Sequence, residues 1–116
     1  MQYIRNYTKV PNSVFEHLNL SEKELKVLLV VVRQVLGWKD PNTGRTKERD
    51  WISQRYYCMR TGLSNRSVST AIDELVQKGM IIATNRGGQE LKRKEERRMQ
   101  ERIYYSLGPT IMKKVH

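Results

Sequence analysis

Apolar residues recur at helical spacing between Ser21 and Gly37, and this pattern predicts a long helix. Ser21 and Glu24 have the spacing of a capping box, in which each side chain accepts a hydrogen bond from the other residue's backbone N–H. Gly37 is suited to end the helix. The expected inward positions are Leu25, Leu28, Leu29, Val32 and Leu36. Because valine and leucine also lie between these positions, we expect the helix to be buried on most of its surface and to form the centre of the core.

A second periodic stretch, residues 64–78, predicts an amphipathic helix that ends at Gly79. Ser64 is a suitable N-cap for this helix. Its apolar stripe consists of Val68, Ile72, Leu75 and Val76. Gly62 lies just before it and has the backbone freedom that a tight turn between helices needs.

A shorter helix is expected on the other side of that turn, from Ser53 as its N-cap to about Arg60. Its inward residues are expected to include Tyr56 or Tyr57, and Met59. A helix, a short glycine turn and an amphipathic helix together form the helix-turn-helix pattern.

The remaining elements are expected to be short. Pro11 disfavours helix at the residue before it, and one or two helical turns carrying Val14, Phe15 and Leu18 should follow it. The segment KDPNTGRTKERD, residues 39–50, is rich in turn-forming and charged side chains and predicts a loop. Short strands are expected at residues 51–52, 80–83 and 103–105, with Gly87 and Gly88 in the turn between the last two.

Two strands that follow a helix-turn-helix predict a wing, here over about residues 81–107. The expected fold class is therefore mainly α with a small β-hairpin (α+β), a winged helix-turn-helix domain over residues 1–107. Residues 108–116 are expected to be a C-terminal tail or a truncated linker.

The charge balance indicates a polyanionic partner. Among the 116 residues there are 22 Lys and Arg and 12 Asp and Glu, which gives a formal net charge of +10. Charge of this size on a small body attracts nucleic acid. A membrane surface is the competing polyanion, but no apolar run reaches the roughly 18 residues of a spanning helix, and no signal peptide opens the chain. We therefore expect a soluble, cytoplasmic protein.

The sequence shows no catalytic or metal-binding constellation. Its one cysteine, Cys58, is assigned to packing, and with only His17 and His116 as further soft ligands no metal-site spacing occurs. Neither a phosphate-cradling glycine loop nor a pair of carboxylates in an apolar setting is present. We expect no enzymatic activity, no metal and no cofactor. Trp38 and Trp51 flank the predicted loop and are expected to cover the core.

The outward face of helix 64–78 is small and polar, with one cation near its start. Arginine can bond guanine, asparagine can bond adenine, and serine or threonine can bond base edges or phosphate in the major groove. The residues expected to contact base edges are Asn65, Arg66, Ser69 and Thr70. Ser64, at the helix N-terminus, is expected to meet a phosphate. The alternative is that this face is only solvated, as on any amphipathic helix.

The predicted wing is long and highly charged, and we expect it to be mobile in the free protein. Its cations are expected to contact phosphates or an adjacent minor groove, adding affinity and salt dependence but little sequence information. They are Arg86, Lys92, Arg93, Lys94, Arg97 and Arg98. The alternatives are a solvated hairpin tip, or a helical excursion in which acidic and basic side chains pair four residues apart.

Four segments in order, YTKVPNSVFEHL, LSEKELKVLLVVVRQVLGW, RDWIS and TGLSNRSVSTAIDELVQKGMI, resemble the amino-terminal domain of the bacteriophage replication protein O family over about residues 5–107. The resemblance implies a winged helix that binds repeated sites at a replication origin, in a bacterial host and in association with its nucleoid or a plasmid. It also implies a separate carboxy-terminal region that recruits the helicase or its loader. That region is missing here, so we expect either an excised domain or a protein that recruits no helicase itself.

These observations predict a sequence-specific protein of double-stranded DNA, the origin-binding domain of a phage or plasmid replication initiator. A small transcriptional repressor or plasmid-partition adaptor is the alternative within DNA binding, and would be expected to bind a palindrome as a homodimer. A winged helix that binds protein through its apolar surface is the alternative of another class. RNA binding is a further alternative, although the chain has few aromatic residues and no recognisable single-strand platform.

Overall fold

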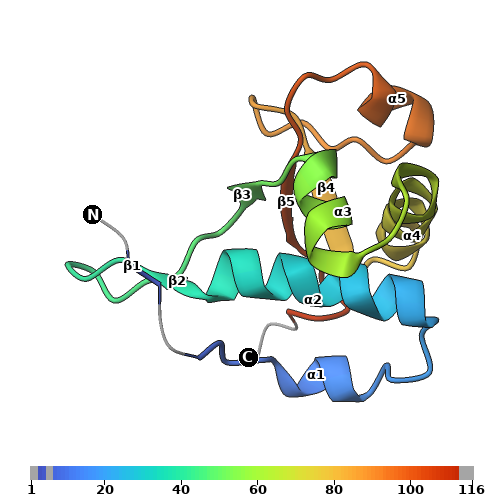
Figure 1. Cartoon of the computed structure of the whole chain (residues 1–116). Coiled ribbons are helices and arrows are strands. Elements are labelled where there is room, and N and C mark those ends of the chain that lie inside the picture. Colours follow the sequence, from blue (N-terminus) through green and yellow to red (C-terminus); the bar gives the residue numbers. More distant parts are fainter. Residues whose placement is uncertain (1–2, 5–6, 113–116) are drawn as a thin grey trace.

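The computed structural model describes residues 3–4 and 7–112 and shows helices packed around a small antiparallel sheet (Figure 1). The helices are α1 (Asn12–Phe15), α2 (Glu22–Leu36), α3 (Gln54–Thr61), α4 (Asn65–Gln77) and α5 (Lys94–Arg98). The strands are β1 (Tyr3–Ile4), β2 (Trp38–Lys39), β3 (Asp50–Trp51), β4 (Ile81–Thr84) and β5 (Tyr104–Leu107). The predicted α+β class is confirmed. None of the described helices is long and apolar enough to cross a bilayer.

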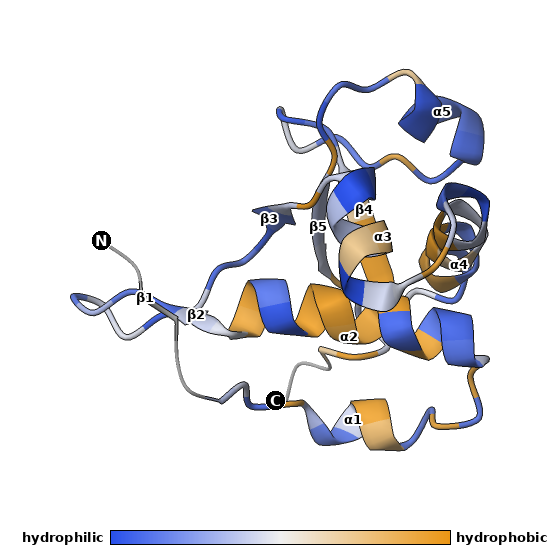
Figure 2. Ribbon diagram, viewed as in Figure 1, coloured by the Kyte–Doolittle hydropathy of each residue, from blue (hydrophilic) through white to orange (hydrophobic). Residues whose placement is uncertain are grey.

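Helix α2 lies at the centre of the molecule, with α3, α4 and β5 packed against it. The predicted capping box is present, because the Ser21 Oγ accepts from the Glu24 N–H and the Glu24 carboxylate accepts from the Ser21 N–H, both at 3.1 Å. Apolar residues form the middle of the helix, and hydrophilic residues gather in its first turns (Figure 2). The buried apolar residues are Val27, Leu28, Val31, Val32 and Val35.

The predicted inward stripe of α2 is rotated from the observed one. Leu29, expected to be inward, is 41% exposed, whereas Val27 and Val31 are fully buried. Since apolar residues occupy every position from residue 27 to 32, periodicity alone does not select the inward side. The neighbours α3, α4 and β5 select it instead, by covering the valine-rich side.

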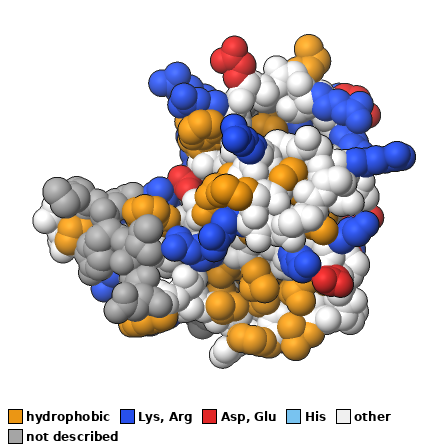
Figure 3. Space-filling model, in the orientation of Figure 1, with side chains coloured by type: hydrophobic (Ala, Val, Ile, Leu, Met, Phe, Trp, Pro, Cys, Tyr) orange, Lys and Arg blue, Asp and Glu red, His pale blue; other side chains and the backbone are white. Residues whose placement is uncertain are grey.

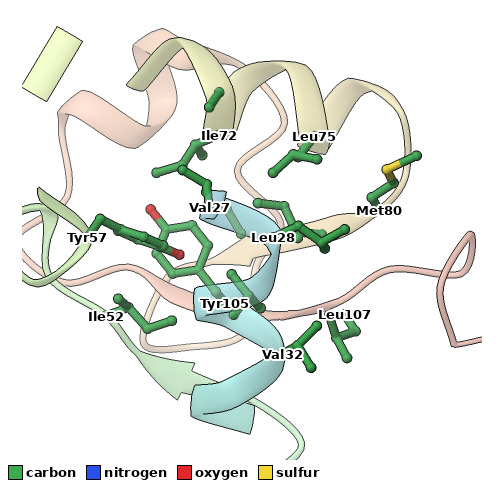
Figure 4. Packing of buried hydrophobic residues seen from close by; sticks show 14 of the residues in the cluster. Val27, Leu28, Val32, Ile52, Tyr57, Ile72, Leu75, Met80, Tyr105 and Leu107 are labelled. Atoms are coloured by element: carbon green, nitrogen blue, oxygen red, sulfur yellow. The ribbon is translucent and has the colours of Figure 1, made fainter. Parts of the chain in front are cut away.

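Helix α4 follows its prediction closely. Its buried residues are Val68, Ala71, Ile72 and Leu75, and in Figure 4 Ile72 and Leu75 point toward Val27 and Leu28 of α2. After its last turn, Gly79 adopts a left-handed φ of 71°. The Met80 N–H then bonds back to the Leu75 carbonyl at 3.0 Å. This is the Schellman arrangement that glycine favours at a helix end.

Helix α3 begins as predicted, with the Ser53 Oγ accepting from the Tyr56 N–H at 3.0 Å. Of its expected inward residues, Tyr57 is fully buried, but the prediction for Met59 is wrong because that side chain is 68% exposed. The Tyr57 and Tyr105 rings meet edge to face, 5.3 Å apart (Figure 4). Burial raises the pKa of both hydroxyls. This aromatic pair joins α3 to β5.

The three-stranded sheet has the order β3-β5-β4 and is antiparallel throughout. Its two long strands confirm the predicted hairpin, in a register that places Ala83 opposite Tyr105. Trp51 was expected to cover the core, but it is 44% exposed and stacks under the Arg102 guanidinium at 4.4 Å. The pairing of β1 with β2 had no signal in the sequence.

Residues 108–112 pack against the body. The Gly108 N–H bonds the Met80 carbonyl at 2.8 Å, and the Ser13 hydroxyl bonds the Ile111 carbonyl at 2.5 Å. Ile111 is buried in the core. The packed body therefore continues past residue 107, where the tail was expected to begin, and residues 113–116 of that tail lie outside the described residues.

An ion pair between a buried carboxylate and a half-exposed lysine joins the start of α2 to the end of α4. Glu24 is 4% exposed, and its carboxylate lies 2.5 Å from the Lys78 Nζ. Burial raises the pKa of the Glu24 carboxyl, but hydrogen bonds from Lys78 and Ser21 together outweigh burial and hold the pKa below its usual 4.5. A carboxyl with a lowered folded-state pKa stabilises the fold above its unfolded-state pKa, and this contribution is lost as the pH falls through the folded-state value.

We therefore expect Glu24→Gln to lower the free energy of unfolding by about 1 kcal/mol at pH 7, since Lys78 is half exposed. The difference from wild type should shrink as the pH falls below 4.5, the usual pKa of this carboxyl. Urea unfolding across a pH series measures it. Glu22→Gln is the matched control, because Glu22 is 81% exposed in its pair with Lys26 and should cost almost nothing. A pH-independent loss in Glu24→Gln would contradict the assignment.

Candidate nucleic-acid interface

The turn between α3 and α4 sets the angle at which α4 leaves the body. Gly62 is left-handed, with φ at 75°, and its N–H bonds the Cys58 carbonyl at 2.9 Å. Leu63 packs against the core. The Ser64 Oγ then accepts from the Ser67 N–H at 3.1 Å and caps α4. The turn and the cap are where the sequence predicts them.

Gln54 fixes the start of α4 from the side of α3. Its amide Nε2 donates to the Asn65 carbonyl at 2.9 Å and to the Ser69 Oγ at 3.0 Å. The Cys58 Sγ donates to the Asn65 Oδ1 at 3.1 Å. Sequence reasoning missed Gln54, because a glutamine in the first turn of a helix carries no signal of a contact to the next helix.

The four residues expected at base edges all lie on the N-terminal half of α4, on two flanks. Arg66 and Thr70 are exposed and line a hollow beside the start of α2, to which Lys23 adds a further cation. Asn65 is exposed on the opposite flank, and Ser69 is half-buried beside Gln54. The flank with Arg66 is therefore the more open one.

The connection between β4 and β5 is folded onto the body. Its tip turns at Gly88, with φ at 90°, where the Gly88 N–H bonds the Asn85 carbonyl at 3.0 Å. Arg49 fastens the tip from β3's side by donating to the carbonyls of Asn85 and Arg86 at 2.9 and 3.1 Å. Leu91 is buried beyond the tip. As the one apolar residue between residues 89 and 98, Leu91 is the sequence signal that this segment packs.

The helical excursion that the sequence left as an alternative is present as α5. Arg93 and Glu96 pair three residues apart at 3.4 Å, rather than four. The backbone N–H of Arg93 holds the pKa of the Glu96 carboxyl below its usual value. The predicted contacts Arg86, Lys92, Arg93 and Arg98 are exposed, and Lys94 is half-buried.

Arg97 is the exception among the predicted phosphate contacts. It is 7% exposed, donates to the Leu91 carbonyl at 2.8 Å, and forms an ion pair with Asp73 of α4. Because its guanidinium is engaged inside the molecule, we withdraw it as a direct DNA contact. Nothing local marks it, since its partner lies on another helix.

Lys and Arg side chains project along the side of the molecule formed by α4 and α5 (Figure 3). Within the described part of the chain, no three His, Cys, Asp or Glu side chains come together as potential metal ligands. Cations, amides and hydroxyls, which can bind phosphates and base edges, share this side with the carboxylates of α4 and α5.

Comparisons with known proteins agree with the resemblance seen in the sequence. The family model described as Bacteriophage replication protein O matches residues 2–96, so the chain belongs to this family. It is also 28% identical over 83 residues to the DNA replication protein gp18 of Salmonella phage P22. That alignment covers 69% of this chain and 28% of the phage protein. No solved structure matches significantly.

Replacing Gly62 tests whether the turn depends on its left-handed backbone. A Cβ at this position would meet no atom within 4 Å, so the cost is that of the backbone alone. We expect Gly62→Ala to lower the free energy of unfolding by about 1–2 kcal/mol, and Gly62→Asn to cost clearly less, because asparagine tolerates this conformation. Chemical denaturation measures both, and equal costs for the two variants would contradict the account.

Proposed function

We propose that this member of the bacteriophage replication protein O family is a sequence-specific protein of double-stranded DNA. In this proposal α3 and α4 form a helix-turn-helix, and the β4–β5 connection is the wing of a winged helix. The main support is the exposed, polar N-terminal half of α4, held by a capped glycine turn on a chain of net charge +10. The N-terminal half of a second helix is the part that major-groove readers use.

The biological role that we propose is binding at a phage or plasmid replication origin, in the cytoplasm of a bacterial host. The family and the phage replication protein gp18 support a role in replication. The chain spans 28% of the length of that relative. Recruitment of a helicase or its loader is therefore a separate proposal, which concerns family members as long as that relative. A repressor or partition adaptor would use the same face of α4, but the family favours the origin.

The side chains on α4 differ in how free they are to bond bases. Arg66 is exposed and has no ion pair within the described residues, so its guanidinium can bond guanine bidentately. Thr70 is exposed beside it. Asn65 already accepts from Cys58, and Ser69 already accepts from Gln54, so each retains mainly its donor for DNA. We therefore assign the principal base contacts to Arg66 and Thr70, with Asn65 and Ser69 as supporting donors.

Phosphate contacts are assigned to the start of α4 and to the connection. The Ser64 Oγ is used in capping, but the helix N-terminus behind it favours an anion. The cations of the connection lie along one side of α4, with Lys92 beside Gln77 at its end and Lys94 and Arg98 beside Ser69. The exposed ones are Arg86, Lys92, Arg93 and Arg98, with half-buried Lys94. Charges of this kind increase affinity for every duplex and carry little sequence preference.

A second candidate function, docking of a protein, is favoured by a groove between α2 and α3. The groove has a volume of about 440 Å³, and its floor contains Leu29, Val30 and Tyr56. Lys26, Arg33 and Arg60 stand around it. An apolar floor within a ring of cations fits an acidic peptide segment that inserts an apolar side chain, whereas DNA has no such group to insert.

Replacing Arg66 tests base reading. Arg66→Ala should weaken binding to the specific duplex by about 1–3 kcal/mol and narrow the gap to random DNA. Fluorescence anisotropy with both duplexes measures the two affinities. Arg45→Ala removes the same charge from the exposed β2–β3 loop and serves as control. An equal loss on both duplexes would show that Arg66 contacts only phosphate.

Replacing two exposed cations tests the wing. Lys92→Ala combined with Arg93→Ala should weaken binding to all duplexes alike. Both side chains are about three-quarters exposed, and an exposed cation attracts the phosphate backbone of any sequence. The dependence of log K on log salt should flatten by roughly 0.9 for each lost phosphate contact. A salt titration of anisotropy measures the slope. A slope equal to that of wild type would identify this segment as a solvated surface.

The groove is tested with a synthetic acidic amphipathic peptide that carries leucines on one face. Leu29→Ser combined with Arg60→Ala should weaken peptide binding at least tenfold while DNA affinity changes little. Met59→Ser is the control, since Met59 is exposed but does not line the groove. Unchanged peptide binding in the double variant would reject this function, and an equal loss of DNA binding would assign the cations to the DNA interface instead.

A further inference from the structure

A small hollow lies where α3, α4 and α5 meet. Its volume is about 120 Å³, and Ile72 and Tyr105 form part of its apolar floor. Five polar side chains of the helices line it, one from α3, one from α4 and three from α5. They are Gln54, Ser69, Lys94, Arg97 and Arg98. Thus one of the proposed base-contact residues shares this hollow with three cations of the wing, of which Arg97 is engaged in the ion pair with Asp73.

We infer that this hollow receives one backbone phosphate of the bound duplex, and that Arg97 is the residue that positions α5 to form it. The inference rests on the proposed DNA binding and adds where α5 sits on the duplex. A phosphate here would lie beside the groove that α4 enters, because Ser69 belongs to both surfaces.

Lys94 and Arg98, the other two cations of the hollow, are available to a ligand. They are four residues apart, which places them on one side of a helical turn. Neither takes part in any ion pair found in the described part of the chain. Gln54 and Ser69 already bond each other, and the serine hydroxyl retains its own proton as a donor. Two cations and a hydroxyl donor around one hollow match the needs of a phosphodiester.

Arg97 holds this arrangement together. A helix of five residues does not hold its place by its own hydrogen bonds. The buried guanidinium of Arg97 attaches α5 to α4 through Asp73, and to the earlier part of the β4–β5 connection through the Leu91 carbonyl. The planar, forked guanidinium can serve two acceptors in fixed directions, which the single ammonium of lysine cannot reproduce.

The same ion pair removes an obstacle to DNA. Asp73 lies on α4 in line with Ser69, and its side chain is one-third exposed. An unpaired carboxylate here would repel a phosphate in the hollow. Arg97 neutralises it, so that Lys94 and Arg98 set the local charge.

The first test removes the two cations and compares this with an equal loss of charge elsewhere. Lys94→Ala combined with Arg98→Ala should flatten the salt slope by about 0.9 to 1.8, for one or two lost phosphate contacts. The control, Lys9→Ala with Arg45→Ala, removes the same formal charge from exposed positions that do not line the hollow. If both double variants have the same slope and affinity, the hollow binds no phosphate and the inference fails.

The second test separates positioning from charge. Arg97→Lys keeps the net charge, so a purely electrostatic role predicts no change, whereas positioning predicts a flatter salt slope and severalfold weaker binding. Arg45→Lys, at an exposed site that is not assigned to the DNA interface, is the matched control. Asp73→Ala gives opposite results for the two roles. If only charge matters, removing a negative charge should tighten DNA binding. If Asp73 is needed to hold α5 against α4, the same change should weaken DNA binding. Circular dichroism and thermal melting show whether each variant is folded.

These outcomes also separate the inference from the function on which it rests. If wild-type protein prefers no duplex over a scrambled one, the proposed function itself fails. If wild type is specific but Asp73→Ala binds more tightly and Arg97→Lys is unchanged, DNA binding stands and the positioning role of Arg97 is overturned. Weaker binding in both of these variants, with the fold retained, supports the inference.

Discussion

The burial of α2 is the constraint on which the rest of the structure depends. Its valine-rich side is covered by α3, α4 and β5 at once, so these elements are placed relative to one another by a common surface. Because interiors are close-packed, α4 cannot turn on its axis without opening a cavity above Val27 and Leu28. The side of α4 that faces solvent is therefore fixed by apolar contacts on its other side. The exposed Arg66 and Thr70 are therefore held on the solvent side of α4 by apolar contacts to which they do not contribute.

A second set of contacts is polar, and these orient the surface. Gln54 holds the first turn of α4 from α3, and Glu24 with Lys78 holds its last turn to the start of α2. Arg97 holds the wing's short helix to the middle of α4. Of these contacts, the ion pair of the buried Arg97 should be the costliest to break. Together the contacts give the proposed DNA surface a defined shape before any ligand is present, which reduces the entropy lost on binding.

The parts of the fold that the sequence predicted are those with local causes. Capping serines, the glycine of the turn and the stripe of Val68, Ile72 and Leu75 act within a few residues, and the structure has them as expected. The rotation of α2 was missed because its apolar positions are nearly continuous. Other contacts were missed because they join residues far apart in the sequence. They are the attachment of α5 to α4, the hydrogen bonds of Gln54 and the pairing of β1 with β2. The four residues expected at base edges share one half of α4, a local grouping that the sequence predicts. The engagement of Arg97 with Asp73 could not be predicted, because the two residues lie on different helices.

The central claim is that α4 reads base sequence. The most direct test compares the affinity of the wild-type protein for duplexes from its own replicon with its affinity for a scrambled duplex. Fluorescence anisotropy over a salt series measures both affinities. The account predicts a repeat in or beside its own gene that binds at least about a thousandfold more tightly than the scrambled control, with the gap retained at physiological salt. Equal binding of every duplex that disappears as salt rises would contradict it, and would leave the face of α4 as solvated surface.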